Sequence, residues 1–336
     1  MRILFSFIAV LALVLIAYAG VKTANLQFLF GVVVPYAAIA LFICGFIYRV
    51  VKWGSSPVPF CIPTTRGQQK SLPWIAQNKL GNPSNTMEVI GRMFLEVFLF
   101  RSLFLNTKTE MTSSNRVVYG SEKFLWLASI TFHYTFLIVL LRHTEFFVPT
   151  APFFLDIIKS VDGFFEIGLP RLFLTGAVLL ASTAYLFARR LYIPQVRYIS
   201  LAADYFPLVL IIGIAITGML MRYVYLTDLV SVKVLALGLL SFKPVIPEGI
   251  GPIFYVHLFL VSVLLAYFPL SKLMHMGGVF LSPTLNMAND SRMTRHINPW
   301  NYPVHVHTYE EYEDDFREKM IGAGIPVEKE GVVNGK

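Results

Sequence analysis

The sequence contains few cysteines and few charged residues. Its 336 residues include two cysteines, Cys44 and Cys61, and 14% are Asp, Glu, Lys or Arg. The two cysteines form no CxxC pair and no CxxCH motif for covalent haem attachment, and a set of four for an iron–sulfur cluster is lacking. Cys44 lies in an apolar block and Cys61 in a polar loop, so we expect no disulfide between them. Any cofactor must therefore be held by ligands other than sulfur.

Clustered basic residues and internal repeats are also lacking. The net charge is +8, but Lys and Arg are spread over the segments between apolar blocks and do not gather on one face among aromatic residues. This distribution argues against a nucleic-acid partner. The lack of an evident repeat argues against a transporter built from duplicated halves.

Long apolar blocks are what the sequence has in abundance. It is 56% hydrophobic with a mean hydropathy of +0.63, whereas soluble domains are about 45–50% apolar and about 25% charged. With ends uncertain by several residues, the blocks have about the length that a helix needs to cross a bilayer core of about 30 Å. We therefore predict an all-α integral membrane bundle of six transmembrane helices. The six blocks are Ile3–Ala19, Phe28–Val50, Phe124–Leu141, Leu172–Ala188, Tyr205–Leu220 and Pro252–Met274.

The first block has a second interpretation. Arg2 precedes it and Ala17, Tyr18 and Ala19 lie near its end, which is also typical of a cleavable signal peptide. We favour a retained anchor, and either alternative places the start of the second block outside the cell.

Basic residues in the connecting segments predict the orientation. Residues 51–120 contain eight Lys or Arg and three Glu, and residues 189–201 contain three Arg and no acid. Residues 145–168 contain Lys159 and four acids, whereas residues 225–250 contain two Lys and two acids. We therefore predict a multi-pass protein of the cytoplasmic membrane with both termini, the 51–120 loop and the tail in the cytoplasm.

Two further segments complete the predicted domain plan. Within the loop, Asn85–Asn106 is apolar but interrupted by charges at helical spacing, which predicts an amphipathic helix at the membrane interface, with Asn85 and Glu88 as a start signal. Residues 277–336 are polar and include the acidic cluster Tyr309–Asp315, so they form either a solvated tail or a strap across a cytoplasmic partner subunit. The predicted parts are 1–50 with two transmembrane helices, 51–120 with the cytoplasmic loop, 121–276 with a four-helix core, and 277–336 with the extended cytoplasmic tail.

Histidines provide the functional signal. Three of the seven (His296, His305 and His307) lie in the tail, where we expect exposed side chains. The other four lie in two apolar blocks only, His133 and His143 in the third and His257 and His275 in the sixth. Polar side chains at membrane depth are costly and face the bundle interior, so these four are candidate ligands.

The two blocks run in opposite directions, which pairs the histidines by depth. His143 matches His257 near the outer face, and His133 matches His275 near the cytoplasm. Imidazole is a common axial ligand of haem iron, so each pair predicts one haem b. Ten residues separate His133 from His143, a helical rise of about 15 Å, whereas eighteen separate His257 from His275, a rise of about 27 Å. Two straight helices therefore cannot bring both pairs together. We therefore predict that the sixth helix bends or ends near Pro269.

Two alternatives stay open on the residues alone. The same histidines would serve a proton relay in a transporter or channel, or the chain could be a structural anchor for peripheral subunits. A single zinc site is disfavoured because the two pairs are too far apart to share one ion.

The histidine pattern resembles a known family. Spacings of ten and eighteen residues, one pair per helix, are similar to those of the cytochrome b (gamma) subunit of respiratory nitrate reductase, over the second block and residues 121–276. The additional first block and the loop from Pro59 to Ser71 (PFCIPTTRGQQKS) resemble the M subunit of the membrane complex associated with dissimilatory sulfite reduction, over nearly the whole chain.

This resemblance implies a role and partners. His133 with His275 would ligate the haem near the cytoplasm, and His143 with His257 the haem near the outer face. The subunit would pass electrons between menaquinone and a cytoplasmic iron–sulfur subunit related to heterodisulfide reductase, within a larger membrane complex of sulfur respiration. Arg142 and Arg222 lie at the depth of the outer pair, where they could meet a haem propionate or a quinone oxygen or serve as snorkelling anchors. No residue is assigned as a catalytic base.

Overall fold

The computed structural model describes residues 1–57, 67–163, 172–292 and 305–329. Contacts divide the chain into two compact units, Met1–Asp290 and Ser291–Lys336. Most of the predicted loop Pro59–Ser71 lies outside the described residues, as do Cys61, Glu166, His296, Trp300 and Tyr302.

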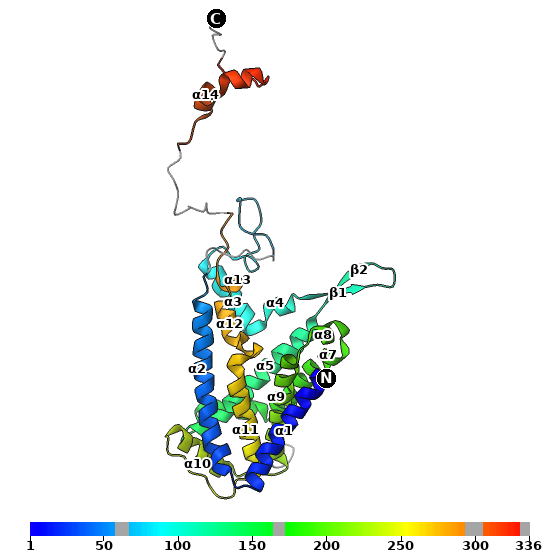
Figure 1. The fold of residues 1–336 in the computed structure, drawn as a ribbon, viewed down its shortest axis with the longest axis vertical. Coiled ribbons are helices and arrows are strands. Elements are labelled where there is room, and N and C mark those ends of the chain that lie inside the picture. Colours follow the sequence, from blue (N-terminus) through cyan, green and yellow to red (C-terminus); the bar gives the residue numbers. More distant parts are fainter. Residues whose placement is uncertain (58–66, 164–171, 293–304, 330–336) are drawn as a thin grey trace. The chain divides into compact units, whose positions relative to one another are not determined.

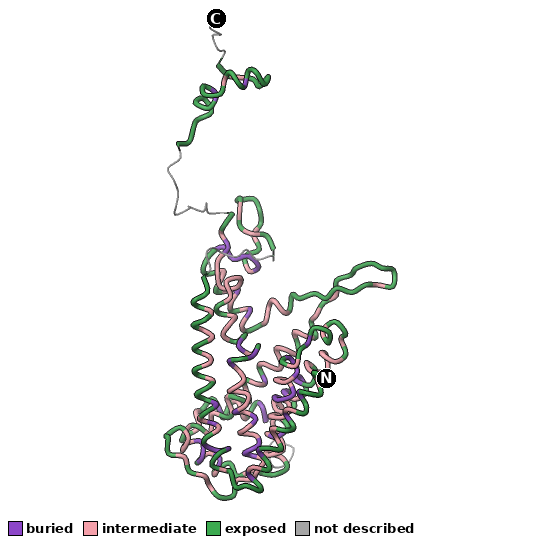
Figure 2. Tube along the Cα trace, in the orientation of Figure 1, coloured by how far each residue is buried: buried purple, intermediate pink, exposed green. Residues whose placement is uncertain are grey.

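Among the described residues, five helices are long and apolar enough to cross a membrane (Figure 1). They match five of the six predicted spans, and many of their large apolar side chains are exposed, as lipid contact requires. Figure 2 marks the exposed residues along the chain. The chain is therefore a multi-pass membrane protein. The five are α1 (Arg2–Lys22), α2 (Val34–Gly54) preceded by the π-helical turn η1 (Leu29–Val33), α5 (Lys123–His143) continued by the 3-10 turn η2 (Thr144–Phe147), α9 (Ala202–Tyr223) and α11 (Pro252–Tyr267).

The remaining predicted span, Leu172–Ala188, corresponds to α7 (Leu174–Tyr192). Its polar residues Ser182 and Thr183 and the terminal Arg189 and Arg190 make it less apolar than the other five. Its role as a sixth span therefore stays a prediction. Shorter helices lie in the connections, namely α6 (Phe153–Asp162), α8 (Pro194–Ile199) and the apolar α10 (Leu229–Leu240). The sequence predicts residues 225–250, which contain α10, only as a connecting segment.

The helices pack into one bundle with a shared core. In the described chain α5 packs on α7 and α7 on α9, whereas α11 packs on α1, α2 and α9. The core lies where α1, α9 and α11 meet and includes the fully buried Ala17, Leu210, Tyr255 and Leu260.

The predicted interruption of the sixth helix is confirmed. α11 ends at Tyr267, and Pro269 lies in the 3-10 turn η3 (Phe268–Leu270), where it cannot donate the backbone hydrogen bond of a continuing α-helix. A second 3-10 turn, η4 (Lys272–Met274), then leads into α12 (His275–Leu281) and α13 (Pro283–Asn286). His275 therefore begins a new helix instead of ending the old one.

The segment between α2 and α5 differs from the prediction in two respects. The expected helix Asn85–Asn106 is split into α3 (Thr86–Leu99) and α4 (Arg101–Phe104), because Phe100 between them adopts a left-handed backbone with a φ of 50°. A two-stranded antiparallel hairpin follows, β1 (Thr107–Met111) with β2 (Val117–Ser121), so the fold is mostly helical and not all-α.

The start of α3 is as predicted. The Asn85 side chain accepts a hydrogen bond from the Glu88 backbone N–H at 3.0 Å and caps the helix. Arg92 and Glu96 are buried, whereas the apolar Ile90 and Phe94 are exposed. The charged face of α3 thus turns toward the protein and its apolar face turns outward.

Amide side chains join this segment to the residues after α13. The Asn289 backbone N–H donates to the Pro83 carbonyl at 2.7 Å, and the Asn289 side chain donates to Asn82 Oδ1 at 3.2 Å. Gln69 in turn donates to Asn289 Oδ1 at 2.8 Å. The beginning of the predicted tail therefore belongs to the membrane unit, which extends to Asp290.

The second unit contains α14 (Tyr309–Gly322). The predicted acidic cluster forms its first half, and Thr308 with Glu311 forms a capping box at its start. The buried Glu313 carboxylate accepts backbone hydrogen bonds from Glu328 at 2.8 Å and Lys329 at 3.0 Å, so the chain folds back along the helix. These bonds, led by the one from Glu328, hold the pKa of Glu313 below its ordinary value.

Candidate functional site

The four histidines of the membrane unit lie in two pairs. His143 at the end of α5 and His257 in α11 form the outer pair, with ring centroids 6.4 Å apart and ring planes at 15°. His133 in α5 and His275 at the start of α12 form the inner pair, with centroids 5.8 Å apart and planes at 84°. The structure therefore brings together the same partners that depth matching in the sequence predicted.

Both separations suit a metal ion between two imidazoles. Two rings that ligate one metal from opposite sides, each with a metal–nitrogen distance of about 2 Å, have centroids about 6 Å apart. Among the described residues, no hydrogen bond joins the two rings of either pair. The spacing therefore fits a shared iron better than direct contact.

Each of the four rings has its Nδ1 atom engaged by the protein. His133 Nδ1 lies 2.7 Å from the Ser129 carbonyl, His143 Nδ1 lies 2.7 Å from the Val139 carbonyl, and His275 Nδ1 lies 2.9 Å from the Lys272 carbonyl. A carbonyl only accepts, so Nδ1 carries the proton and Nε2 keeps its lone pair for a ligand. Such outer contacts fix ring orientation at metal sites.

His257 has a side-chain partner instead of a carbonyl. Its Nδ1 atom lies 2.9 Å from Thr217 Oγ1 on α9. The Thr217 hydroxyl lies 2.8 Å from the Gly213 carbonyl and donates there, so it accepts from His257. The adjacent Gly218 leaves room for the ring, because a Cβ at that position would lie 3.2 Å from His257 Cε1. α9 therefore orients the outer pair although it contributes no ligand.

The bend at Pro269 sets the position of His275. Gly45 of α2 faces this proline, and a Cβ there would lie 2.6 Å from the Pro269 Cβ atom, closer than any side chain tolerates. The Phe42 and Phe268 rings meet edge to face at 5.5 Å beside it. Close approach of α2 thus supports the bend and, through it, the inner pair.

The helices that hold the pairs are separated from each other. α5 packs mainly on α7, whereas α11 packs on α1, α2 and α9, and the pair α5 with α11 is not among the extensive helix packings of the described chain. A flat macrocycle needs such a separation between its two ligand-bearing helices. Together with the free Nε2 atoms, this arrangement fits two haems in the bundle core.

The α3–α4 junction lies against the inner pair. The Phe100 ring meets the His133 ring edge to face at 5.0 Å. Trp126 Nε1 donates to the Leu99 carbonyl at 2.8 Å, and the Tyr134 hydroxyl donates to the Phe98 carbonyl at 2.9 Å, so two side chains of α5 clamp the junction. This contact accounts for the unusual backbone of Phe100, which the sequence does not signal because glycine or asparagine is expected there.

Arg142 and Arg222 meet over one aromatic ring. The guanidinium carbons of Arg142 and Arg222 lie 3.9 Å and 4.1 Å from the Phe173 centroid. Arg142 also forms a salt bridge of 2.9 Å with Asp162, whose side chain is 3% exposed. Thr175 donates to both Asp162 oxygens, and the Phe173 backbone N–H donates to the Tyr223 hydroxyl oxygen.

This arrangement bears on the two interpretations of the arginines. Arg142 is largely buried, as its side chain is 13% exposed, so it is not a snorkelling anchor in free contact with water. The cluster brings the two guanidinium groups together near His143, and Asp162 pairs with Arg142. Guanidinium groups are donors that bind anionic and carbonyl oxygens.

Sequence reasoning missed several contributors to these sites. Thr217 and Asp162 were visible as polar residues at or near membrane depth, which is a signal that points to interior contacts. Phe100 and Phe173 gave no signal, because an aromatic residue in an apolar stretch is unremarkable in sequence. The tail histidines His305 and His307 are exposed, as expected.

Comparisons with known proteins show the family of the chain. Residues 92–290 match the family model described as nitrate reductase gamma subunit. Two curated relatives are both described as "Hdr-like menaquinol oxidoreductase cytochrome b-like subunit". The one from Archaeoglobus fulgidus is 45% identical over 280 residues, which is 81% of this chain and 83% of the relative. The one from Archaeoglobus profundus is 39% identical over 274 residues, which is 80% of this chain and 81% of the relative. The matched region spans more than half of the chain and contains all four paired histidines, and the chain therefore belongs to the nitrate reductase gamma subunit family.

Proposed function

We propose that this chain is the dihaem cytochrome b subunit of a membrane complex that passes electrons between the menaquinone pool and a cytoplasmic iron–sulfur subunit. The observation that supports it most is the pair of imidazole couples at two levels of the bundle, with centroids 5.8 Å and 6.4 Å apart. His133 with His275 and His143 with His257 are the proposed axial ligands of two haems b. A haem bound in this way supplies one-electron transfer with both axial positions occupied.

The protein's own contribution is orientation and environment. Carbonyl groups one helical turn before His133 and His143 hold Nδ1–H, and Thr217 does the same for His257. These contacts fix the ring orientations, leave Nε2 available for a ligand and increase its basicity. Phe100 covers His133 and helps to exclude water on that side.

The proposed quinone or propionate contacts are Arg142 and Arg222. Both lie over Phe173 next to the outer pair, so they can hold a propionate carboxylate or donate to a quinone carbonyl oxygen. Asp162 is a carboxylate of this cluster, and its salt bridge with Arg142 supports a positioning role for it.

The proposed topology has six spans, with α7 as the fourth and both termini in the cytoplasm. The even number of spans and the excess of Lys and Arg in residues 51–120 and 189–201 support it. α3 is proposed to lie in the cytoplasmic interface, and its outward apolar face (Met87, Ile90, Phe94 and Phe98) supports this position.

The partner and pathway are proposed from likeness and composition. The relatives are named as subunits of a menaquinol oxidoreductase, and the loop Pro59–Ser71 with the first span resembles the M subunit of the sulfite-reduction complex. The chain's two cysteines cannot hold an iron–sulfur cluster alone, so the sulfur chemistry would belong to another subunit. The acidic, aromatic helix α14 would contact that subunit, and sulfur respiration would be its setting.

Reduction by menaquinol tests this function. Full-length protein purified in detergent is mixed without oxygen with reduced menaquinone, and reduced-minus-oxidised absorbance is recorded. We expect protohaem bands that menaquinol reduces, and a weaker response in His143→Ala and His133→Ala. A colourless protein, as the transporter and anchor alternatives require, contradicts the proposal.

A further inference from the structure

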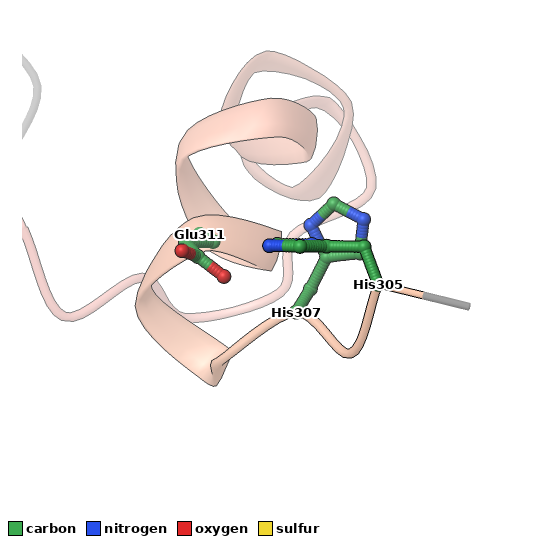
Figure 3. Close-up of side chains that lie close together, drawn as sticks. All are labelled: His305, His307 and Glu311. Carbon is green, nitrogen blue, oxygen red and sulfur yellow. The ribbon is translucent and has the colours of Figure 1, made fainter. Parts of the chain in front are cut away.

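Two exposed histidines and a glutamate come together at the start of α14. His305 and His307 lie in the segment that leads into the helix, and Glu311 lies in its first turn. One possible ligand atom from each residue lies within 4.8 Å of the others, and the side chains are grouped on one side of the chain (Figure 3). The two imidazole centroids are 4.8 Å apart.

We propose that His305, His307 and Glu311 bind a divalent transition-metal ion of the zinc type. Imidazole nitrogen and carboxylate oxygen are the donors that such ions prefer, and three protein ligands with water in a fourth position form an open tetrahedral site. Alternate residues of an extended segment project to the same side, which brings His305 and His307 toward one ion. The site lies in the second unit and is independent of the proposed haems.

Glu311 is held in place before any ion arrives. Its carboxylate accepts a hydrogen bond from the Thr308 backbone N–H at 2.9 Å, and the Thr308 hydroxyl accepts from the Glu311 N–H at 3.3 Å. This capping box occupies Oε2 and leaves Oε1 as a ligand atom. The carboxylate is therefore both anchored and available.

His307 has a carboxylate behind its ring. Its Nδ1 atom lies 3.8 Å from Asp315 Oδ2, one helical turn beyond Glu311. This distance is that of an ion pair and is longer than a hydrogen bond. With a metal on the other nitrogen, the ring could donate to this carboxylate, which is the usual outer contact of histidine ligands.

The consequence is local ordering of the segment that enters α14. An ion held by His305, His307 and Glu311 would tie this segment to the first turn of the helix. Because the ligands must lose their protons to bind, the site would release the ion in acid.

Zinc titration of the full-length protein tests the proposal. Protein in detergent is treated with a chelator, dialysed and titrated with Zn²⁺ in competition with a chromogenic chelator. His305→Gln, His307→Gln and Glu311→Gln are compared with wild type, and glutamine at position 311 preserves the capping box. Glu318→Gln, on the same helix and also exposed, is the matched control.

We expect wild type and Glu318→Gln to bind one more zinc ion per chain than His305→Gln or His307→Gln. Asp315→Asn should weaken binding by about 10–100-fold, as loss of an outer carboxylate does. Zinc should also slow hydrogen exchange of residues 305–311 in wild type and in Glu318→Gln, but not in His305→Gln or His307→Gln. Equal zinc content in wild type and the histidine variants, or no zinc in wild type, overturns the proposal. Haem content is measured in the same samples, and its absence would contradict the proposed function without affecting this result.

Discussion

Replacing Thr217 with valine removes the hydroxyl that accepts the His257 Nδ1–H at 2.9 Å and keeps the shape of the side chain. The buried N–H would then lack this partner in a low-dielectric environment, which costs about 1–3 kcal/mol. Loss of an outer partner of a metal ligand lowers affinity by about 10–100-fold, which corresponds to about 1.4–2.8 kcal/mol. The two estimates agree, so we expect the outer haem to bind about 10–100-fold more weakly.

Thr135 of α5 provides the control for this experiment. It is 8% exposed, against 6% for Thr217. Its hydroxyl bonds to the backbone carbonyls of Thr131 and Phe132, in the same way that the Thr217 hydroxyl bonds to the Gly213 carbonyl. Thr135→Val therefore repeats the chemical change without touching a ring nitrogen.

Haem transfer to apomyoglobin measures the difference. Purified wild type, Thr217→Val and Thr135→Val are mixed with excess apomyoglobin, and the rate of haem loss is followed by absorbance. We expect a fast phase for about half of the haem in Thr217→Val only. Identical rates in all three proteins would refute the role given to Thr217.

Three further predictions follow from individual contacts. Gly45→Ala should weaken haem binding at the inner pair, because the new Cβ would lie 2.6 Å from the Pro269 Cβ atom. In Gly54→Ala, on the same helix, the new Cβ meets nothing within 4 Å, so this control should bind two haems. Haem content after gel filtration checks both variants. Asp162→Asn leaves the Arg142 charge unpaired in a buried position and should destabilise the protein by about 3–5 kcal/mol, seen as a lower thermal unfolding temperature in detergent. The pKa of Glu313 is depressed in the folded tail, so the stability that its carboxylate provides is present above the ordinary pKa of 4.5 and is lost as the pH falls below that value. Backbone hydrogen exchange of residues 328–329, corrected for intrinsic rates, should therefore show protection that disappears in acid. Unchanged protection would contradict the assignment.

Much of the membrane bundle could be predicted because it depends on composition and spacing. Apolar length located the spans, and the mismatch between ten-residue and eighteen-residue histidine spacings predicted the interruption that the structure has at Pro269. Both are consequences of fixed helix geometry and of the missing proline N–H. The pairing of the four rings followed from the opposite directions of two helices.

Other features depend on tertiary contacts that sequence patterns do not encode. Phe100 adopts its backbone because α5 side chains clamp the residues before it, so the predicted helix Asn85–Asn106 was wrong in its continuity. The hairpin Thr107–Ser121 is short and polar, with no strong alternation, and was missed. The approach of Arg142 and Arg222 to Phe173 joins three separate helices or connections, which spacing along the chain cannot reveal.

Pyridine haemochrome analysis of the purified chain tests the central claim most directly. We predict two protohaems per chain in wild type and one in either His143→Ala or His257→Ala, because those two rings are proposed to share one iron. Loss of both ligands together should remove no more haem than loss of one. A wild-type protein with no haem, or a His143→Ala variant that keeps both haems, would contradict the assignment of the imidazole pairs.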